Sequence, residues 1–188
     1  MVPIGDLLVP ILLSAIAVFF ASFLVWAVLP WHKGDWKHLD GEDALMKTLR
    51  ELGLSRGQYT WPQAATRPPK TWSEAEAKRV REGPLGSLVL WGQGPPSMGK
   101  SMGLWLVYLL VVSWVVAYLA GRTLAPGADY LAVFRVTGTV AFLAYAGARP
   151  SDSIYFFHSW SSTIKMMIDG LLYGLLTAGF FGWLWPGL

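Results

Sequence analysis

The stretch that decides the fold is Met102–Ala120, MGLWLVYLLVVSWVVAYLA, which contains no charged residue and no proline. As an α-helix it is about 28 Å long, close to the roughly 30 Å thickness of the hydrocarbon core of a bilayer. A helix that is apolar on every side needs apolar surroundings on every side. The stretch therefore predicts a transmembrane helix.

Three further stretches have the same character and predict three more transmembrane helices. They are Leu7–Leu29, Tyr130–Ala148 and Ile164–Trp185. The first is too long for the apolar core of a signal peptide and has no basic residue before it, so we expect it to be retained. The predicted fold class is an all-α membrane protein with four transmembrane helices and a small α+β cytoplasmic cap between helices 1 and 2.

The composition agrees with a membrane protein and excludes several kinds of site. Of the 188 residues, 54% are hydrophobic and 14% are charged, whereas a soluble domain is about 25% charged. Eleven tryptophans suit the membrane–water interface. The chain has no cysteine, which excludes disulfides, thiolate metal sites and cysteine nucleophiles within it.

The polar segment 30–101 separates helix 1 (1–29) from helices 2–4 (102–188), and its local patterns predict an ordered cap. Ser73-x-x-Glu76 is a capping box at the start of a short helix. A second helix is expected after Asp40, as its N-cap. Two short stretches have the composition of strands that could pair, namely Gln58–Trp61 and Ser87–Trp91.

The distribution of basic residues predicts the orientation of the four helices. Pro30–Lys100 holds 11 Lys and Arg, and the loop on the same side adds Arg149. The opposite side holds only Arg122. Because basic residues near helix ends stay in the cytoplasm, we expect a cytoplasmic cap and both termini outside a bacterial inner membrane.

Gly94–Ser101, GPPSMGKS, matches the phosphate-loop pattern G-x-x-x-x-G-K-[ST]. That loop binds phosphate through consecutive backbone N–H groups, and Pro95 and Pro96 have none. The helix that follows is a predicted membrane span. We therefore expect no nucleotide and no nucleic acid as partner, and interpret Lys100 as a residue at the lipid head groups.

His32, Asp35, His38 and Asp40 lie close together at the mouth of helix 1. Imidazole and carboxylate groups can bind zinc or iron, which makes His32 and His38 the weak candidates for a metal site. The interleaved tryptophans and lysines instead indicate an interfacial belt. We therefore predict no metal here, and no catalytic residue elsewhere in the chain.

Three ionisable residues fall inside predicted helices, namely Arg135, Lys165 and Asp169. Arg135 and Asp169 lie at different depths and are not expected to pair. Lys165 and Asp169 are four residues apart on one helix and can satisfy each other. We interpret the three as anchoring residues, since a proton half-channel would need a carboxylate nearer the middle of the membrane.

Small residues recur at helical spacing on two of the predicted helices. Such residues allow close helix packing, either within the bundle or against another protein. They are Ser113, Ala117 and Gly121 on one helix, and Gly170, Gly174, Ala178 and Gly182 on the other.

Three stretches together resemble a group of small bacterial inner-membrane proteins with four spans and no assigned function. They are LPWHKGDW at Leu29–Trp36, LAGRTLAPG at Leu119–Gly127 and IDGLLYGLLTAGFFGWLWP at Ile168–Pro186. The resemblance covers the whole length. It implies a bacterial inner membrane and four spans, and it implies no activity, cofactor or catalytic residue.

The sequence predicts a non-catalytic accessory or scaffolding subunit of a larger inner-membrane assembly, such as a photosynthetic or respiratory electron-transfer complex. Its expected partners are membrane lipids and other integral membrane subunits. No cofactor is expected in this chain alone, while a lipid, quinone or pigment at an interface with partners stays open. The alternatives are a homo-oligomeric small channel or carrier, and an enzyme using the cluster of His32 and His38.

Overall fold

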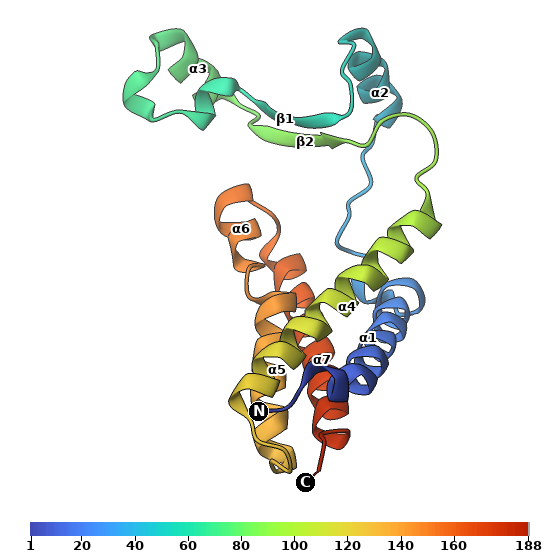
Figure 1. Ribbon diagram of the computed structural model, residues 1–188. Coiled ribbons are helices and arrows are strands. Elements are labelled where there is room, and N and C mark those ends of the chain that lie inside the picture. Colours follow the sequence, from blue (N-terminus) through green and yellow to red (C-terminus); the bar gives the residue numbers. More distant parts are fainter. Residues whose placement is uncertain (188) are drawn as a thin grey trace. The chain divides into compact units, whose positions relative to one another are not determined.

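The computed structural model describes residues 1–187, which form two compact units (Figure 1). Residues 1–38 and 97–187 form a helical unit, and Leu39–Pro96 forms the cap. The sequence grouped residues 30–38 with the cap. They fold with the helical unit instead, because His32 and Asp35 are hydrogen-bonded to helix α7.

Within residues 1–187, four helical segments are long and apolar enough to span a membrane, as predicted. Their bounds extend the predicted ones by a few residues at several ends. They are Ile4–Val28, which comprises η1 (Ile4–Leu7), α1 (Leu8–Phe23) and the π-helical turn η2 (Leu24–Val28); α4 (Met98–Thr123); Tyr130–Phe156, which comprises α5 (Tyr130–Ala146) and α6 (Pro150–Phe156); and α7 (Trp160–Trp183).

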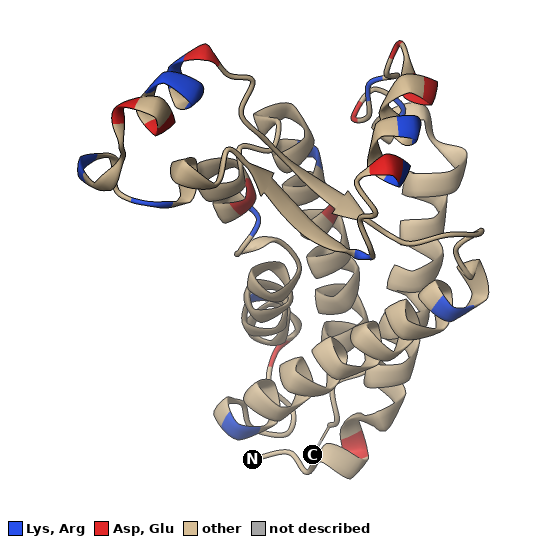
Figure 2. Ribbon diagram, turned by 90° about the horizontal axis from the view of Figure 1, so that it is seen from above, with Lys and Arg blue, Asp and Glu red and all other residues tan. Residues whose placement is uncertain are grey.

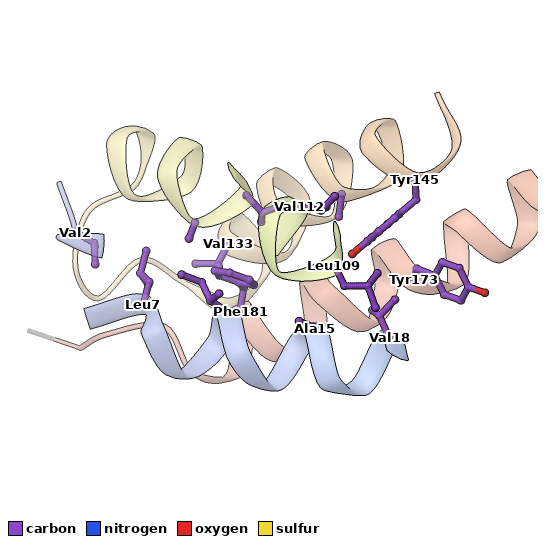
Figure 3. Close-up of a cluster of buried hydrophobic side chains, with 14 residues drawn as sticks. Val2, Leu7, Ala15, Val18, Leu109, Val112, Val133, Tyr145, Tyr173 and Phe181 are labelled. Carbon is purple, nitrogen blue, oxygen red and sulfur yellow. The ribbon is translucent and has the colours of Figure 1, made fainter. Parts of the chain in front are cut away.

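The core of the helical unit lies where the four segments meet (Figure 3). Each contributes large side chains that are almost completely buried, among them Leu7, Leu109, Val133 and Phe181. The closest packing is between α5 and α7, because glycines on α7 let the two backbones approach. The helices therefore form one packed bundle.

Both ends of the chain lie at the same end of this bundle (Figure 1). The Val2 N–H donates to the Gly121 carbonyl at 2.8 Å, and the Gly127 N–H donates to the Pro186 carbonyl at 2.8 Å. The last turn of α4 thus contacts the chain near the N-terminus, and the connection from α4 to α5 contacts it near Pro186. The other end of the bundle is where α1 ends and where α4 and α7 begin.

The cap consists of two short helices and a two-stranded antiparallel sheet. Strand β1 (Gly57–Trp61) pairs with β2 (Gly86–Leu90), with Tyr59 opposite Leu88, which confirms the predicted pairing. The remaining elements are α2 (Glu42–Glu51), α3 (Glu74–Glu82), and the 3-10 turns η3 (Pro30–His32, in the helical unit), η4 (Gln63–Thr66) and η5 (Pro69–Thr71).

Local capping decides where the two cap helices start. The predicted capping box of α3 is confirmed: Ser73 accepts from the Glu76 N–H, and Glu76 accepts from the Ser73 N–H. Hydrogen bonds from the backbone and side chain of Ser73 hold the pKa of Glu76 below its usual value. The prediction of Asp40 as N-cap of α2 was wrong. Gly41 occupies that position with φ +86°, a left-handed conformation that glycine adopts without strain.

Charge is distributed unevenly between the two units (Figure 2). Lys, Arg, Asp and Glu crowd onto α2 and α3, while the long helices carry very few. Leu39–Pro96 holds 8 Lys and Arg against 7 Asp and Glu. The cap is therefore densely charged but nearly neutral.

Candidate functional site

The buried residue His32 lies just after the first long segment, in the 3-10 turn η3. Leu29 is extended before Pro30, as a residue before proline prefers, and Pro30 begins the 3-10 turn η3. The turn continues with the Asp35 N–H donating to the His32 carbonyl at 3.0 Å. This local geometry brings the side chains of His32 and Asp35 face to face.

The imidazole of His32 lies between two carboxylates. Its Nδ1 is 2.6 Å from Oδ2 of Asp35, and its Nε2 is 2.8 Å from Oδ2 of Asp169 on α7. His32 is 6% exposed and Asp169 5% exposed. The ring of His32 thus joins Asp35 of the loop to Asp169, which is 137 positions from His32 in the sequence.

The remaining carboxylate oxygens also have donors. Lys165 Nζ donates to Oδ1 of Asp35 at 2.6 Å, and Trp31 Nε1 donates to Oδ1 of Asp169 at 3.1 Å. All four oxygens of the two carboxylates are therefore hydrogen-bonded. We call the set of Trp31, His32, Asp35, Lys165 and Asp169 the histidine–aspartate network.

Aromatic rings enclose this network. The indole of Trp26 stacks on the imidazole of His32, with ring centres 3.8 Å apart and planes inclined by 9°. Lys165 Nζ lies 5.8 Å from the ring centre of Trp31, within range of a cation–π interaction. The rings exclude solvent from the charges, which strengthens the attraction between them.

The hydrogen bonds constrain the charge state of the network. An ionised carboxylate can only accept, so two ionised partners require both nitrogens of His32 to carry protons. The imidazolium and Lys165 then balance Asp35 and Asp169. If His32 is neutral, one carboxyl group must hold the proton instead. In both cases one proton is held in common by the imidazole and the two carboxyl groups.

The pKa of Asp35, which lies outside the long helices, is lowered. Burial alone would raise the pKa of its carboxyl group. Hydrogen bonds and charge from Lys165 and His32 outweigh that effect and hold the pKa below its ordinary value. Asp35 is thus stabilised as the anion that orients the imidazole.

The structure separates the two histidines that the sequence grouped. His38 is exposed and takes no part in the network, while His32 is buried in it. Asp169 draws His32 into the bundle, and the interfacial belt stays a prediction for the exposed Lys33, Trp36 and Lys37. Among residues 1–187, no three His, Asp or Glu side chains are arranged as ligands of one metal ion.

The ionisable residues of the long helices have different partners from those expected. Lys165 binds Asp35 and not Asp169, although Lys165 and Asp169 lie one turn apart on α7. Asp169 is taken by His32 and Trp31. Arg135 is exposed on α5 and forms no ion pair within the described residues. It lies near the start of α5, at the end of the bundle opposite to the histidine–aspartate network.

The small residues of α7 face helix α5. A Cβ on Gly170 would lie 2.7 Å from the Ala146 Cβ, and one on Gly174 would lie 3.2 Å from the Phe142 nitrogen. Two further contacts of this stripe are Ala178 beside Gly138 and Gly182 beside Tyr130. On α4, Ser113 and Ala117 are buried and Gly121 lies against Val2.

Sequence reasoning missed Trp31 and Asp35 as partners in one network. A signal was present: His32-x-x-Asp35 follows directly on a helix end, and Asp169 is a carboxylate inside an apolar helix that needs a partner. The hydrogen bond from Ser14 to Ser113 at 3.1 Å, and that from Trp105 to Ser22 at 2.9 Å, had no comparable signal.

No family model, curated protein or solved structure matched the chain in comparisons with known proteins. The function is therefore argued from the chain's own residues.

Proposed function

We propose that this chain is a non-catalytic accessory subunit of a larger assembly in a bacterial inner membrane, with the cap in the cytoplasm. The observation that supports the proposal is the exposed apolar surface of the cap. Within Leu39–Pro96 one side chain, Ala64, is buried. Eight large apolar side chains in this segment are at least 41% exposed, namely Leu39, Leu45, Met46, Leu52, Trp61, Leu85, Val89 and Trp91.

Such a cap lacks the core that would hold it together alone. A two-stranded sheet is marginally stable in water unless one face packs against something else. Small units bury too little apolar surface to offset the entropy of ordering the chain. The cap therefore gains stability from a surface that covers it.

Three of these exposed apolar side chains lie in or beside strand β2. Side chains alternate between the faces of a strand, so Val89 lies on the exposed face of β2, and Leu85 and Trp91 flank the strand on either side. They are 52%, 57% and 74% exposed. We call these three residues the β2 stripe. An exposed tryptophan among aliphatic residues is typical of the centre of a protein interface.

The charge of the cap favours a protein over a lipid surface as the covering partner. Segments that bind anionic lipids have a clear excess of Lys and Arg. Leu39–Pro96 has 8 Lys and Arg against 7 Asp and Glu. A mixed, nearly neutral surface around an apolar stripe fits another subunit.

The proposal is tested on a native gel of membranes solubilised in a mild detergent. We expect the wild type to migrate in a complex much heavier than its own 20.7 kDa. Val89→Ser combined with Trp91→Ser should release the chain from that complex. Lys78→Ser, a control at a side chain that is 70% exposed on α3, should not. A wild type that migrates alone would contradict the proposal.

A homo-oligomeric channel or carrier is the second candidate, and the buried histidine–aspartate network favours it. Ionisable groups enclosed by apolar helices often mark a path for ions or protons. Asp169→Asn and Arg135→Gln separate the two functions. In reconstituted vesicles a channel would lose proton or ion flux in these variants. An accessory subunit would show no flux even as the wild type.

A further inference from the structure

The helical unit contains a cavity of about 950 Å³ at the end of the bundle where α1 ends and where α4 and α7 begin. This volume lies in the upper part of the range of small-molecule sites, about 300–1,000 Å³. Its lining comes from all four long segments. The lining residues include Phe19, Trp26, Met102, Trp105, Tyr145 and Tyr173.

A row of aromatic rings forms much of the wall. Trp105 stacks on Tyr108 with ring centres 5.3 Å apart. The rings of Tyr108 and Tyr145 meet edge-on with their centres 6.4 Å apart, and those of Tyr145 and Tyr173 do so with centres 5.7 Å apart. Such a wall offers an extended apolar surface to an aliphatic chain or a flat ring. It offers very little to water, which needs two to four polar partners.

Most polar groups of the lining already have partners within the chain. Trp105 donates to Ser22, Tyr108 donates to the Ala144 carbonyl, and Asp169 is held by the histidine–aspartate network. These groups shape the wall and leave little hydrogen-bonding capacity for a ligand. They also fix the aromatic rings in place.

Two hydroxyl groups are exceptions. Tyr145 and Tyr173 are 7% and 5% exposed, and neither hydroxyl has a hydrogen-bond partner among the described residues. Figure 3 shows both rings at one end of the core, with their hydroxyls pointing in different directions. A buried polar group without a partner is rare in a folded protein and indicates a partner that the protein chain does not supply. The Tyr145 hydroxyl lies beside the buried Ser113 and Thr177, which do not line the cavity, so the donor that fits an oxygen atom of a ligand is Tyr173.

The polar donors and the apolar side chains of the lining lie on different sides of the cavity. The α5–α7 side supplies the unpartnered hydroxyl of Tyr173 and the guanidinium of Arg149, which is 3.6 Å from Asp152. The α1–α4 side is largely apolar, with Phe23, Ala27 and Met98 among its residues. A ligand that matches both sides is amphipathic.

We infer that this cavity binds one lipid-soluble molecule with a long apolar chain and an oxygen-bearing head that accepts hydrogen bonds. The chain lies along the α1–α4 side, and the head accepts from Tyr173 or Arg149. Phospholipids and isoprenoid carriers share this chemistry. The inference is independent of the accessory-subunit proposal, since it concerns the bundle and not the cap.

The test is native mass spectrometry of the whole protein purified in mild detergent, with the bound molecule identified by extraction and mass. We expect one adduct per chain, and the measured mass distinguishes a phospholipid from an isoprenoid. Ala27→Phe and Ser101→Phe fill the cavity at exposed lining positions and should reduce the adduct at least tenfold. Val28→Phe, next to Ala27 but outside the lining, should retain it.

Tyr173→Phe provides a second readout, the thermal midpoint, which does not require the adduct to survive purification. With a ligand at the hydroxyl, removing that hydroxyl weakens binding and lowers the thermal midpoint. With an empty site, the same change removes an unpartnered polar group and raises the midpoint. A raised midpoint, an adduct unaffected by Ala27→Phe and Ser101→Phe, or no adduct in the wild type would overturn the inference.

Discussion

His32 is the residue on which the charge balance inside the helical unit depends. It lies between Asp35 and Asp169, and the three are almost completely enclosed. Without the imidazole, two carboxylates would face a single cation, Lys165. Removing one member of a buried charged network costs more than the network contributes as a whole, because an unpaired charge stays behind.

We therefore expect His32→Ala to lower the free energy of unfolding by about 3–5 kcal/mol, the usual cost of breaking a buried ion pair. His38→Ala is the matched control, because His38 is exposed and should change stability by less than about 0.5 kcal/mol. Thermal unfolding in one detergent measures both. Equal midpoints for the two variants would show that the network contributes nothing to stability.

The pH dependence of stability reports on Asp35. Its pKa in the folded chain lies below the ordinary value of 3.8, so the folded state binds fewer protons than the unfolded state in acid. The resulting stabilisation is present above pH 3.8 and is lost as the pH falls through the folded pKa. Asp35→Asn should flatten the loss of thermal stability below about pH 4. Asp40→Asn, at an exposed residue outside the network, should leave it as in the wild type.

At the scale of elements, the contact between α5 and α7 organises the bundle. Gly170 and Gly174 lie against the backbone or Cβ atoms of α5, where a side chain has no room. In a bilayer, close van der Waals packing replaces the hydrophobic effect as the force between helices. This stripe therefore serves the chain's own bundle, and a second subunit would have to bind elsewhere.

Two alanine substitutions on α7 test this packing. Gly170→Ala places a Cβ 2.7 Å from that of Ala146 and should destabilise the bundle by about 1–3 kcal/mol. Gly179→Ala meets no atom within 4 Å, so it should be neutral or stabilise the helix by up to about 1 kcal/mol. The measurement is the thermal midpoint in a common detergent. Equal effects of the two changes would contradict the packing described here.

At the scale of the whole molecule, the four long segments put both termini at one end of the bundle. The cap joins the opposite end, at His38 and Ser97. If all four segments cross a membrane, the cap and the termini lie on opposite sides of it. The larger number of basic residues on the cap side then favours our proposal of a cytoplasmic cap.

Reporter fusions test this orientation. A reporter enzyme that is active only outside the cytoplasm should be active when fused at the C-terminus. The same reporter inserted at Pro68, in the cap, should be inactive. Western blots check that both fusions accumulate equally. The opposite pattern of activity would place the cap outside and overturn the argument from charge.

The sequence by itself determined the features that depend on local chemistry. Four long helices follow from the length of the apolar stretches, since an unbroken apolar run can satisfy its backbone only within itself. The capping box at Ser73 and Glu76 follows from hydrogen bonds within one turn. The pairing of β1 with β2 follows from two short strand-like stretches in the same small segment.

Only the tertiary structure decided which distant residues meet. Lys165 is one turn from Asp169, yet it binds Asp35, because the η3 turn brings Asp35 and His32 onto α7. The cavity behind Tyr145 and Tyr173 likewise depends on how four helices cross. Helix length and caps are set by neighbours in sequence. Partners of buried charges and the shape of a cavity are set by the faces that packing brings together, which no local pattern encodes.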